Sequence, residues 1–337
     1  MKLADFDYHL PPELIAQYPC EKRDQSRLMV VDRVSQSLEH HRFRDLPRFL
    51  SSRDLLVLNN TRVIPARLYA YREGRQEKIE VLLLSSLEGD VWEALIKPGK
   101  KARPGVRLVF QSGEFEAEVL GAPDSAVRRL RFEYSGEFWE WIERLGQTPL
   151  PPYISRQSTT DDRERYQTVF ASVSGSVAAP TAGLHLTREL LEETSHCKIT
   201  LHVGYGTFKP VSVESVKDHQ MDSEYYEIGS EAATRIAEIP RNGRVIAVGT
   251  TTTRALEHVF SKHQQITTDR GWTDLFISPG FDFKVIRGLI TNFHLPRSTL
   301  LLLVSAFAGR KLVQKCYREA IVRGYRFYSY GDAMLIL

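Results

Sequence analysis

The sequence predicts an α+β fold, in which a mixed α/β main domain is built from two distant segments and interrupted by a small all-β, barrel-like domain. Six short runs of alternating apolar and polar residues follow one another between Leu68 and Tyr134 without a helical period, which is typical of a small barrel or sandwich. Both flanks are mixed, and the 337 residues suffice for about two domains. We therefore expect a main domain over residues 1–66 and 136–337 and an inserted domain over residues 67–135.

Two apolar runs before the insertion, residues 28–31 and 54–58, predict buried strands. The insertion holds the six alternating strands, and turn residues such as Glu73-Gly74 and Pro98-Gly99 separate them. The predicted strands of the insertion cover residues 67–71, 78–84, 91–96, 106–110, 115–120 and 127–132.

After the insertion, capping and stop signals delimit the helices. Thr187 can cap a short helix that contains Leu190 and Leu191, and Pro240 ends a helix over residues 231–239. Ser298 follows Pro296 and opens a helix whose apolar run belongs to the core. The remaining predicted elements are helices over 254–260 and 310–322 and strands over 244–248, 326–330 and 333–336.

Composition excludes several classes of protein. The chain has 45 Lys and Arg against 42 Asp and Glu and a normal share of apolar residues, which excludes a disordered chain. Its three cysteines lie far apart, so a disulfide scaffold is excluded as well. The N-terminus lacks the apolar core of a signal peptide, and the longest apolar stretch, residues 299–308, is about half of the ~20 residues that span a bilayer. We expect a soluble, cytoplasmic protein, with a monomer favoured.

Several turns carry residues suited to a small polar ligand. Gly249 ends a predicted strand before Thr250, Thr251 and Arg254, where a helix N-terminus offers unpaired N–H groups. A plain threonine-rich helix cap would have the same sequence. A run of small residues from Gly175 ends in His185, which could exchange a proton or simply be a hydrogen-bonded loop residue.

Three further segments have two interpretations each. Residues 202–208, with Tyr205 and Gly206, form either a glycine-bulged strand or a loop that wraps a nucleoside. Residues 291–296 bring an amide, an aromatic ring and an imidazole to the start of a helix, and Asp332 follows a terminal run that could be an ordinary turn. A metal site is not expected, because His40 and His41 are adjacent and no HExxH motif or Cys/His cluster exists.

Basic residues cluster in and beside the insertion. A solvated surface could explain any one group, but together they indicate a surface that binds a polyanion. The three groups are Arg62 with Arg67, Lys97 with Lys100, Lys101 and Arg103, and Arg128 with Arg129 and Arg131.

Long motifs in order along the chain resemble one family. They cover residues 5–8, 26–28, 59–68, 178–185, 203–208, 249–251, 291–300 and 329–334. The chain is similar in these motifs to the S-adenosylmethionine:tRNA ribosyltransferase-isomerases of queuosine biosynthesis. The resemblance implies an inserted β-barrel domain, in agreement with the alternating strands. It also implies transfer and isomerisation of the ribosyl part of S-adenosylmethionine onto 7-aminomethyl-7-deazaguanine at the tRNA wobble position.

This implied reaction gives epoxyqueuosine in tRNA and releases adenine and methionine. S-adenosylmethionine would then be a consumed substrate, modified tRNA the partner, and neither a cofactor nor a metal is expected. The resemblance suggests His185, His294 and Asp332 as proton-transfer residues, and the basic groups above as tRNA contacts. The residues suggested to bind the substrate are Thr181, Gly183, Tyr205, Gly206, Thr250, Thr251, Arg254, Asn292 and Phe293.

The sequence departs from the family pattern at four positions. Asn60 stands where Asp is usual and Asp222 where His is usual, while Leu186 and Leu201 replace a common Phe and Thr. These departures leave two alternatives open. The chain could be a non-catalytic RNA-binding protein on the same scaffold, or an enzyme that acts on another nucleoside.

Overall fold

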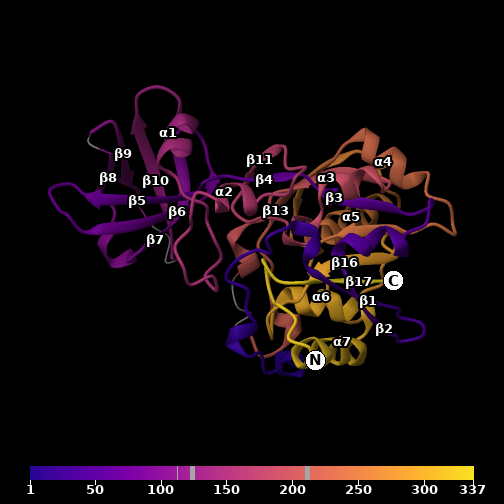
Figure 1. Ribbon diagram of the computed structural model, residues 1–337. Helices are drawn as coiled ribbons and strands as arrows, with labels where there is room; N and C mark the ends of the chain where they lie inside the picture. Colours follow the sequence, from indigo (N-terminus) through magenta and orange to yellow (C-terminus); the bar gives the residue numbers. More distant parts are fainter. Residues whose placement is uncertain (112, 122–125, 209–212) are drawn as a thin grey trace. The chain divides into compact units, whose positions relative to one another are not determined.

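The computed structural model describes residues 1–111, 113–121, 126–208 and 213–337. The chain divides into two compact units, the first formed by residues 1–62, 152–156 and 167–337 and the second by residues 63–151 and 157–166. A nine-stranded mixed sheet lies in the first unit and a closed six-stranded barrel in the second (Figure 1). The predicted α+β fold with an all-β barrel is therefore confirmed.

The strand order of the large sheet is β15-β13-β12-β3-β14-β16-β17-β1-β2. Strands β12, β3, β14 and β16 run parallel, β17 is antiparallel to β16, and β1 is parallel to β17. The bounds are β1 Arg27–Val31, β2 Leu38–Arg42, β3 Leu55–Asn59, β12 His196–Leu201, β13 Glu224–Ile228, β14 Val245–Val248, β15 Asp269–Thr273, β16 Gly288–Asn292 and β17 Ala333–Ile336. A separate two-stranded sheet pairs β4 Thr61–Val63 with β11 Val173–Ser176.

The central strands are buried on both faces, which explains their nearly continuous apolar sequences. In β3, Leu55 and Val57 belong to one core cluster, and Leu56 and Leu58 belong to the other. Helices α4 to α7 contribute to the first cluster, while α3 and the short helical turns around residues 43–49 and 181–185 contribute to the second. The sheet thus forms the middle of three layers (Figure 1).

Two helices of the first unit begin where the sequence predicts, at Thr187 and at Ser298. The Thr187 hydroxyl accepts a hydrogen bond from the Leu190 N–H at 3.3 Å, and the Ser298 hydroxyl accepts one from the Leu301 N–H at 3.2 Å. Helix α5 begins four residues earlier than predicted, directly after Gly249, whose φ of 97° suits glycine. The bounds are α3 Arg188–Glu192, α4 Ser230–Ala237, α5 Thr250–His263, α6 Thr299–Ala308 and α7 Arg310–Val322. Among the described residues, no helix has the length and apolar character needed to cross a membrane.

The barrel closes in the strand order β10-β7-β6-β5-β8-β9. Helix α1 Phe138–Leu145, which the sequence analysis did not predict, packs on it: Phe138 stacks on Trp92 and Trp141 on Phe115. The unit that contains the barrel therefore continues past the predicted limit at residue 135. The remaining bounds are β5 Arg67–Arg72, β6 Lys78–Ser86, β7 Val91–Lys97, β8 Arg107–Gln111, β9 Phe115–Val119, β10 Val127–Tyr134 and α2 Asp162–Arg165.

One predicted strand is wrong. Residues 326–330 form a turn, in which Tyr328 has a φ of 71° and only Phe327 makes a bridge, to Ile15. The carboxylate of Asp332 accepts the Arg326 N–H at 2.7 Å and thereby closes this turn. Asp332 also accepts the Arg27 N–H at the start of β1, and this pair of hydrogen bonds outweighs the strand-like pattern at this point. The sequence analysis also did not predict β2, β12, β13, β15 and β16 as strands.

Candidate active site

Polar residues of distant segments meet at one edge of the large sheet. The parallel strands β3, β14 and β16 end there, at Asn59, Gly249 and Asn292, and the oppositely directed β1 and β17 begin there. In open α/β sheets this edge is the usual place for ligands. A small cavity opens at it, and its lining includes Tyr153, Thr181, Asn292, His294, Tyr328 and Ser329.

A larger cavity of about 480 Å³ lies elsewhere in the same unit, between residues 5–9 and helices α6 and α7. Both linings are mainly apolar by area, but the smaller cavity is the one that lies at the sheet edge, and there it combines hydroxyl, amide and imidazole groups. Ligand sites with chemistry need such convergent polar groups. We therefore place the candidate active site at the smaller cavity.

Asn292 is the centre of a hydrogen-bond chain. Its Oδ1 accepts from the Thr181 hydroxyl at 3.2 Å, and its Nδ2 donates to the Tyr328 carbonyl at 3.1 Å and to His185 Nε2 at 3.2 Å. Since Nε2 of His185 accepts, Nδ1 carries the proton and donates to the Ser26 hydroxyl at 2.7 Å. The chain thus determines both the orientation of the Asn292 amide and the tautomer of His185.

His185 lies behind Asn292. It is buried, and its ring stacks on Phe43 with 5.0 Å between the centroids. Burial, followed by the charges of Arg326 and Arg23, lowers the pKa of His185 to about 3, so the imidazole is neutral at pH 7. With both ring nitrogens engaged, His185 is placed to orient Asn292, and its predicted role in proton transfer stays a prediction.

His294 lines the cavity itself. Its Nε2 lies 2.6 Å from the Thr291 hydroxyl, while Nδ1 has no hydrogen bond to another described residue. Burial lowers the pKa of His294 to about 3. The imidazole is therefore neutral at pH 7, and in this form it can accept a proton.

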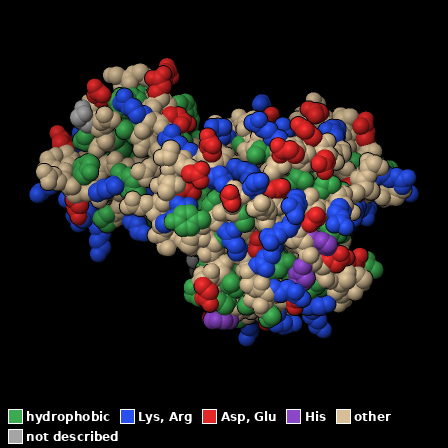
Figure 2. Space-filling view, viewed as in Figure 1, with side chains coloured by type: hydrophobic (Ala, Val, Ile, Leu, Met, Phe, Trp, Pro, Cys, Tyr) green, Lys and Arg blue, Asp and Glu red, His purple; other side chains and the backbone are tan. Residues whose placement is uncertain are grey.

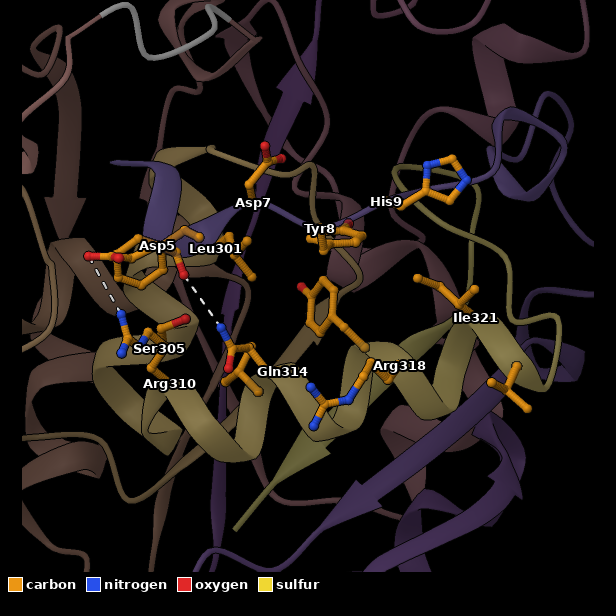
Figure 3. Close-up of a pocket in the computed structure, with 14 residues that line it drawn as sticks. Asp5, Asp7, Tyr8, His9, Leu301, Ser305, Arg310, Gln314, Arg318 and Ile321 are labelled. Carbon is orange, nitrogen blue, oxygen red and sulfur yellow. Dashed lines mark hydrogen bonds and ion pairs between the residues drawn. The ribbon is translucent and has the colours of Figure 1, made fainter. Parts of the chain in front are cut away.

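Two tyrosines hold the backbone of His294. The Tyr8 hydroxyl donates to the His294 carbonyl, and the Tyr317 hydroxyl accepts from the His294 N–H at 2.9 Å. Both tyrosines also line the large cavity, where Figure 3 shows Tyr8 above helix α7 and Gln314 and Arg310 turned toward Asp5. The N-terminal segment and α7 therefore act together on the position of His294.

We expect Tyr317→Phe to lower kcat about tenfold, because loss of one hydrogen bond to the His294 backbone leaves a buried N–H unpaired at a cost of about 1–3 kcal/mol. The Michaelis constant for tRNA should stay unchanged. Tyr226→Phe is the matched control, since its buried hydroxyl donates to Asp269 at 2.8 Å and contacts neither His294 nor the cavity. Equal losses of kcat in both variants, measured alongside thermal stability, would contradict a specific effect on His294.

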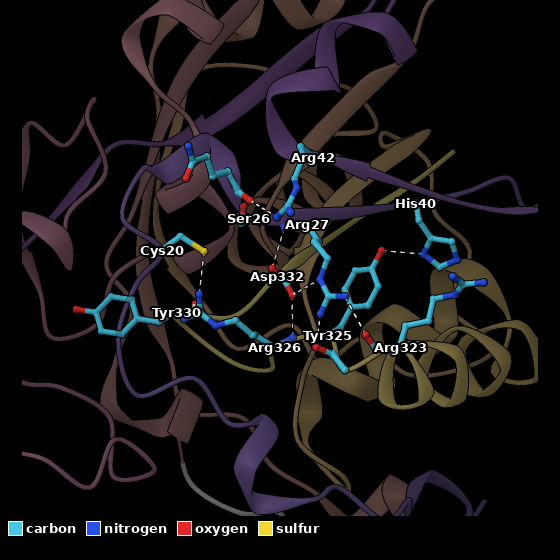
Figure 4. Close-up of polar contacts among 12 residues, drawn as sticks. Cys20, Ser26, Arg27, His40, Arg42, Arg323, Tyr325, Arg326, Tyr330 and Asp332 are labelled. Atoms are coloured by element: carbon cyan, nitrogen blue, oxygen red, sulfur yellow. Dashed lines mark hydrogen bonds and ion pairs between the residues drawn. The ribbon is translucent and has the colours of Figure 1, made fainter.

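Asp332 does not line the cavity. Its carboxylate is buried and accepts from the Arg27 N–H at 2.8 Å, the Arg326 N–H at 2.7 Å and Arg27 Nε at 3.3 Å (Figure 4). These bonds connect the start of β1 to the turn before β17. The geometry assigns Asp332 to the support of the sheet edge, so its suggested proton transfer does not fit.

The first turn of α5 lies beside the short helical turn of residues 181–185. A Cβ on Gly249 would lie 3.8 Å from the Cβ of Ala182, so the two segments are close neighbours. The hydroxyls of Thr252 and Thr253 donate back to the carbonyls of Val248 and Gly249. The other two threonines of this turn, Thr250 and Thr251, are therefore the ones that could contact a ligand.

Arg254 forms a buried ion pair with Glu224, and each side chain is only 4% exposed. Glu224 Oε1 also accepts the Gly204 N–H at 2.9 Å, so the pair supports the loop before Tyr205 and Gly206. Burial lowers the pKa of Arg254 to about 10. Its Nη1 has no hydrogen-bond partner among the described residues.

The other suggested substrate contacts have different surroundings. Phe293 is fully buried against Tyr317, Tyr325 and Phe327, so it cannot stack on a substrate base. Gly183 and Gly206 serve close packing: a Cβ would lie 2.9 Å from Phe170 in the first case and 2.2 Å from the Asp222 carboxylate in the second. The segment around Tyr205 is a short 3-10 turn, Tyr205–Phe208, rather than a bulged strand.

Sequence reasoning missed three site residues: Ser26, Tyr153 and Asn59. Asn59 ends the apolar run of β3, and its amide donates to the Leu201 carbonyl at 2.9 Å and accepts from the Leu201 N–H at 3.0 Å. In the sequence, an asparagine directly after four apolar residues was the signal that could have identified Asn59. Tyr153 stacks near Tyr328 with 4.2 Å between the centroids, and no local pattern pointed to this contact.

The four residues that depart from the family pattern make ordinary packing and hydrogen-bond contacts. Asn60 accepts the Thr200 hydroxyl at 2.8 Å, and Leu186 and Leu201 are fully buried. Asp222 lies against Gly206. None of these four residues lines the cavity. In the described part of the chain, no three His, Cys, Asp or Glu side chains are grouped so that they could hold a metal ion.

The basic residues of the barrel are largely matched by acidic ones. Lys101 pairs with Glu77, Arg67 lies 3.5 Å from Glu80, and Arg131 lies 3.9 Å from Glu118. Across the strands, Arg129 is opposite Glu93. Acidic residues outnumber basic ones in the second unit, while basic residues are in excess in the first. A tRNA surface at Arg62, Lys97, Lys100, Arg103 and Arg128 stays a prediction.

Comparison with known proteins identifies the family. The family model described as queuosine biosynthesis protein matches residues 3–336. The chain belongs to this family. It is 53% identical over 342 residues to an S-adenosylmethionine:tRNA ribosyltransferase-isomerase of Acetivibrio thermocellus, and 54% identical over 343 residues to one of Desulfitobacterium hafniense, with 100% of each chain covered.

A solved structure agrees with these family members. The crystal structure of the S-adenosylmethionine tRNA ribosyltransferase from Thermotoga maritima is 41% identical to this chain, and the alignment covers 99% of this chain and 100% of that one, with a TM-score of 0.56. Both the family assignment and the fold that the sequence motifs implied are thereby confirmed.

Proposed function

We propose that this protein is an S-adenosylmethionine:tRNA ribosyltransferase-isomerase. The observation that carries the proposal is the match to enzymes of this name over the full chain at more than half identity. The polar cavity around Asn292 and His294 supports it, because it offers the hydrogen-bonding and proton-accepting groups that such a reaction needs.

The finer proposal concerns the reaction. The ribosyl part of S-adenosylmethionine is transferred to the aminomethyl group of 7-aminomethyl-7-deazaguanine at the tRNA wobble position and becomes the epoxycyclopentanediol of epoxyqueuosine. At the 1′ carbon, a C–N bond to the tRNA amine and a C–C bond to the 5′ carbon form, which closes the cyclopentane ring, and the furanose oxygen moves from the 1′ to the 5′ carbon to give the epoxide. The C–N bond to adenine, the C–S bond to methionine and one 5′ C–H bond break. S-adenosylmethionine is a consumed substrate.

The residues of the cavity have distinct tasks in this proposal. The sulfonium acidifies the neighbouring 5′ carbon, and the neutral His294 imidazole takes a proton there or from the attacking amine. The oxygens of Thr181 and Asn292 accept hydrogen bonds from the nucleoside, since their own N–H and O–H groups are engaged within the protein, and the buried chain through His185 keeps the Asn292 amide in one orientation. Thr250 and Thr251, in the first turn of α5 beside residues 181–185, serve as further substrate contacts in this proposal.

A chromatographic assay tests the proposal. The protein is incubated with S-adenosylmethionine and tRNA that carries 7-aminomethyl-7-deazaguanine, and released adenine and methionine are measured. We expect release that depends on the modified base. Equal release with unmodified tRNA would indicate another nucleoside substrate, and absence of release despite tRNA binding would indicate a binding protein on this scaffold.

A further inference from the structure

A basic hollow lies on the first unit beside the candidate active site. It has a volume of about 590 Å³ and lies between strands β1 and β2 and the C-terminal end of α7. Figure 2 shows Lys and Arg side chains in blue crowded around purple histidines on this face. We call it the arginine hollow, and the charged and titratable residues that line it are Arg27, His40, His41, Arg42, Asp45 and Arg323.

The arginines of the hollow are positioned by protein contacts that leave positive charge exposed. The Arg27 guanidinium lies 4.1 Å from the centroid of the Tyr325 ring, and its Nε forms an ion pair with Asp332 at 3.3 Å (Figure 4). Arg42 donates to the Gln25 carbonyl at 2.8 Å and has no acidic partner among the described residues. Arg323 is 55% exposed even though it pairs with Glu319.

The residues that line the hollow include three arginines and one acidic residue, Asp45. Asp332 pairs with Arg27 and Glu319 pairs with Arg323, whereas the Arg42 guanidinium forms no ion pair with a described residue. The pKa of His40 is lowered mostly by burial and further by Arg323, against the smaller opposing effect of Glu319. An anion that enters the hollow therefore meets guanidinium N–H groups, with the charge of Arg42 not offset by an ion pair.

The register of the sheet places the hollow close to the reacting groups. The pairing joins Asn292 to Ala333, Ala333 to Leu28, and Leu28 to His41, so one row of residues runs from the cavity to the hollow. Three strand spacings of ~4.8 Å make this distance about 14 Å. A nucleic-acid strand whose base occupies the cavity can reach the hollow with its neighbouring phosphates.

We propose that the arginine hollow binds the sugar–phosphate backbone of tRNA next to the nucleotide that enters the active site. The inference rests on the proposed function for the identity of the RNA. Guanidinium groups suit this task because they bind phosphate oxygens in pairs with a rigid fork. Such contacts position the RNA but read no sequence, so they add affinity for modified and unmodified tRNA alike.

The test compares two variants that each remove two charges. Arg42→Gln/Arg323→Gln changes the hollow at exposed side chains, and Lys100→Gln/Lys101→Gln changes the barrel surface to which the sequence pointed. Binding of tRNA without S-adenosylmethionine is measured by fluorescence anisotropy over a series of salt concentrations. We expect the slope of log K against log salt to become shallower by about 1.5 in the hollow variant, since each phosphate contact contributes about 0.7–0.9.

The slope should change less in the barrel variant, because Lys101 already pairs with Glu77. An unchanged slope in the folded hollow variant would overturn the inference, as would a wild type that binds no tRNA. A shallower slope in the barrel variant alone would place the phosphate contacts on the barrel instead. Because the binding assay needs no turnover, wild-type protein that binds tRNA with the expected slopes but releases no adenine would refute the proposed reaction and leave the surface standing.

Discussion

The His294→Ala variant should lose turnover by about 10²-fold or more, the size of a general acid–base contribution. His294 is the imidazole that lines the cavity, and burial holds its pKa near 3, so the ring is neutral at pH 7. Adenine release in the presence of modified tRNA measures the loss. The affinity for tRNA should stay unchanged, because His294 lies in the cavity and not in the arginine hollow.

His185→Gln is the variant to compare. Since His185 contacts Asn292 and Ser26 and does not line the cavity, we expect a smaller loss of kcat, about tenfold, below the range of general acid–base effects. A larger loss in His185→Gln than in His294→Ala would reverse the two roles. Because both imidazoles have a pKa near 3, the rate should show no inflection from them between about pH 5 and 8.

Arg254→Ala should lower the free energy of unfolding by about 3–5 kcal/mol, because removal of one partner leaves the other charge buried. Glu224 would lose its cationic partner while its Oε1 still accepts the Gly204 N–H at 2.9 Å, and its carboxylate is nearly inaccessible to water. Urea unfolding measures the change. The effect should be larger than that of any exposed ion pair in the protein, for which about 0–1 kcal/mol is usual.

The double variant Arg254→Met/Glu224→Gln provides the control for this prediction. It removes both charges and keeps an oxygen that can accept the Gly204 N–H, so most of the lost stability should return. If Arg254→Ala is as stable as the wild type, the pair does not hold the loop before Tyr205, and Arg254 would then be available for a substrate group.

The candidate site could be predicted only in part. The long motifs pointed to Thr181, His185, Asn292 and His294, which the structure brings to one edge of the sheet. They did not separate the imidazole that lines the cavity from the one behind it. That distinction depends on which side of Asn292 each ring occupies, and this follows from the packing of segments more than a hundred residues apart.

The tRNA surface shows the same limit. The basic groups of the barrel are close in sequence. Three of their residues pair with Glu77, Glu80 and Glu118, and these ion pairs depend on contacts between strands and turns that the positions of the charges in the sequence do not reveal. The hollow has the opposite character. Arg27, Arg42 and Arg323 form no cluster in the sequence. The folded structure brings them together, and the pairing of β1 with β2 places Arg27 opposite Arg42.

The sequence by itself determined the local elements: the alternating strands of the barrel, the capped starts at Thr187 and Ser298, and the stop at Pro240. Each depends on residues within a few positions of one another, where backbone preference and side-chain caps decide. Tertiary structure alone decided the turn at residues 326–330 and the row from Asn292 to His41. In both, residues 332–333 contact the start of β1, 305 residues earlier in the chain, and the buried Asp332 carboxylate, which must satisfy two backbone N–H groups, outweighs a local preference for strand.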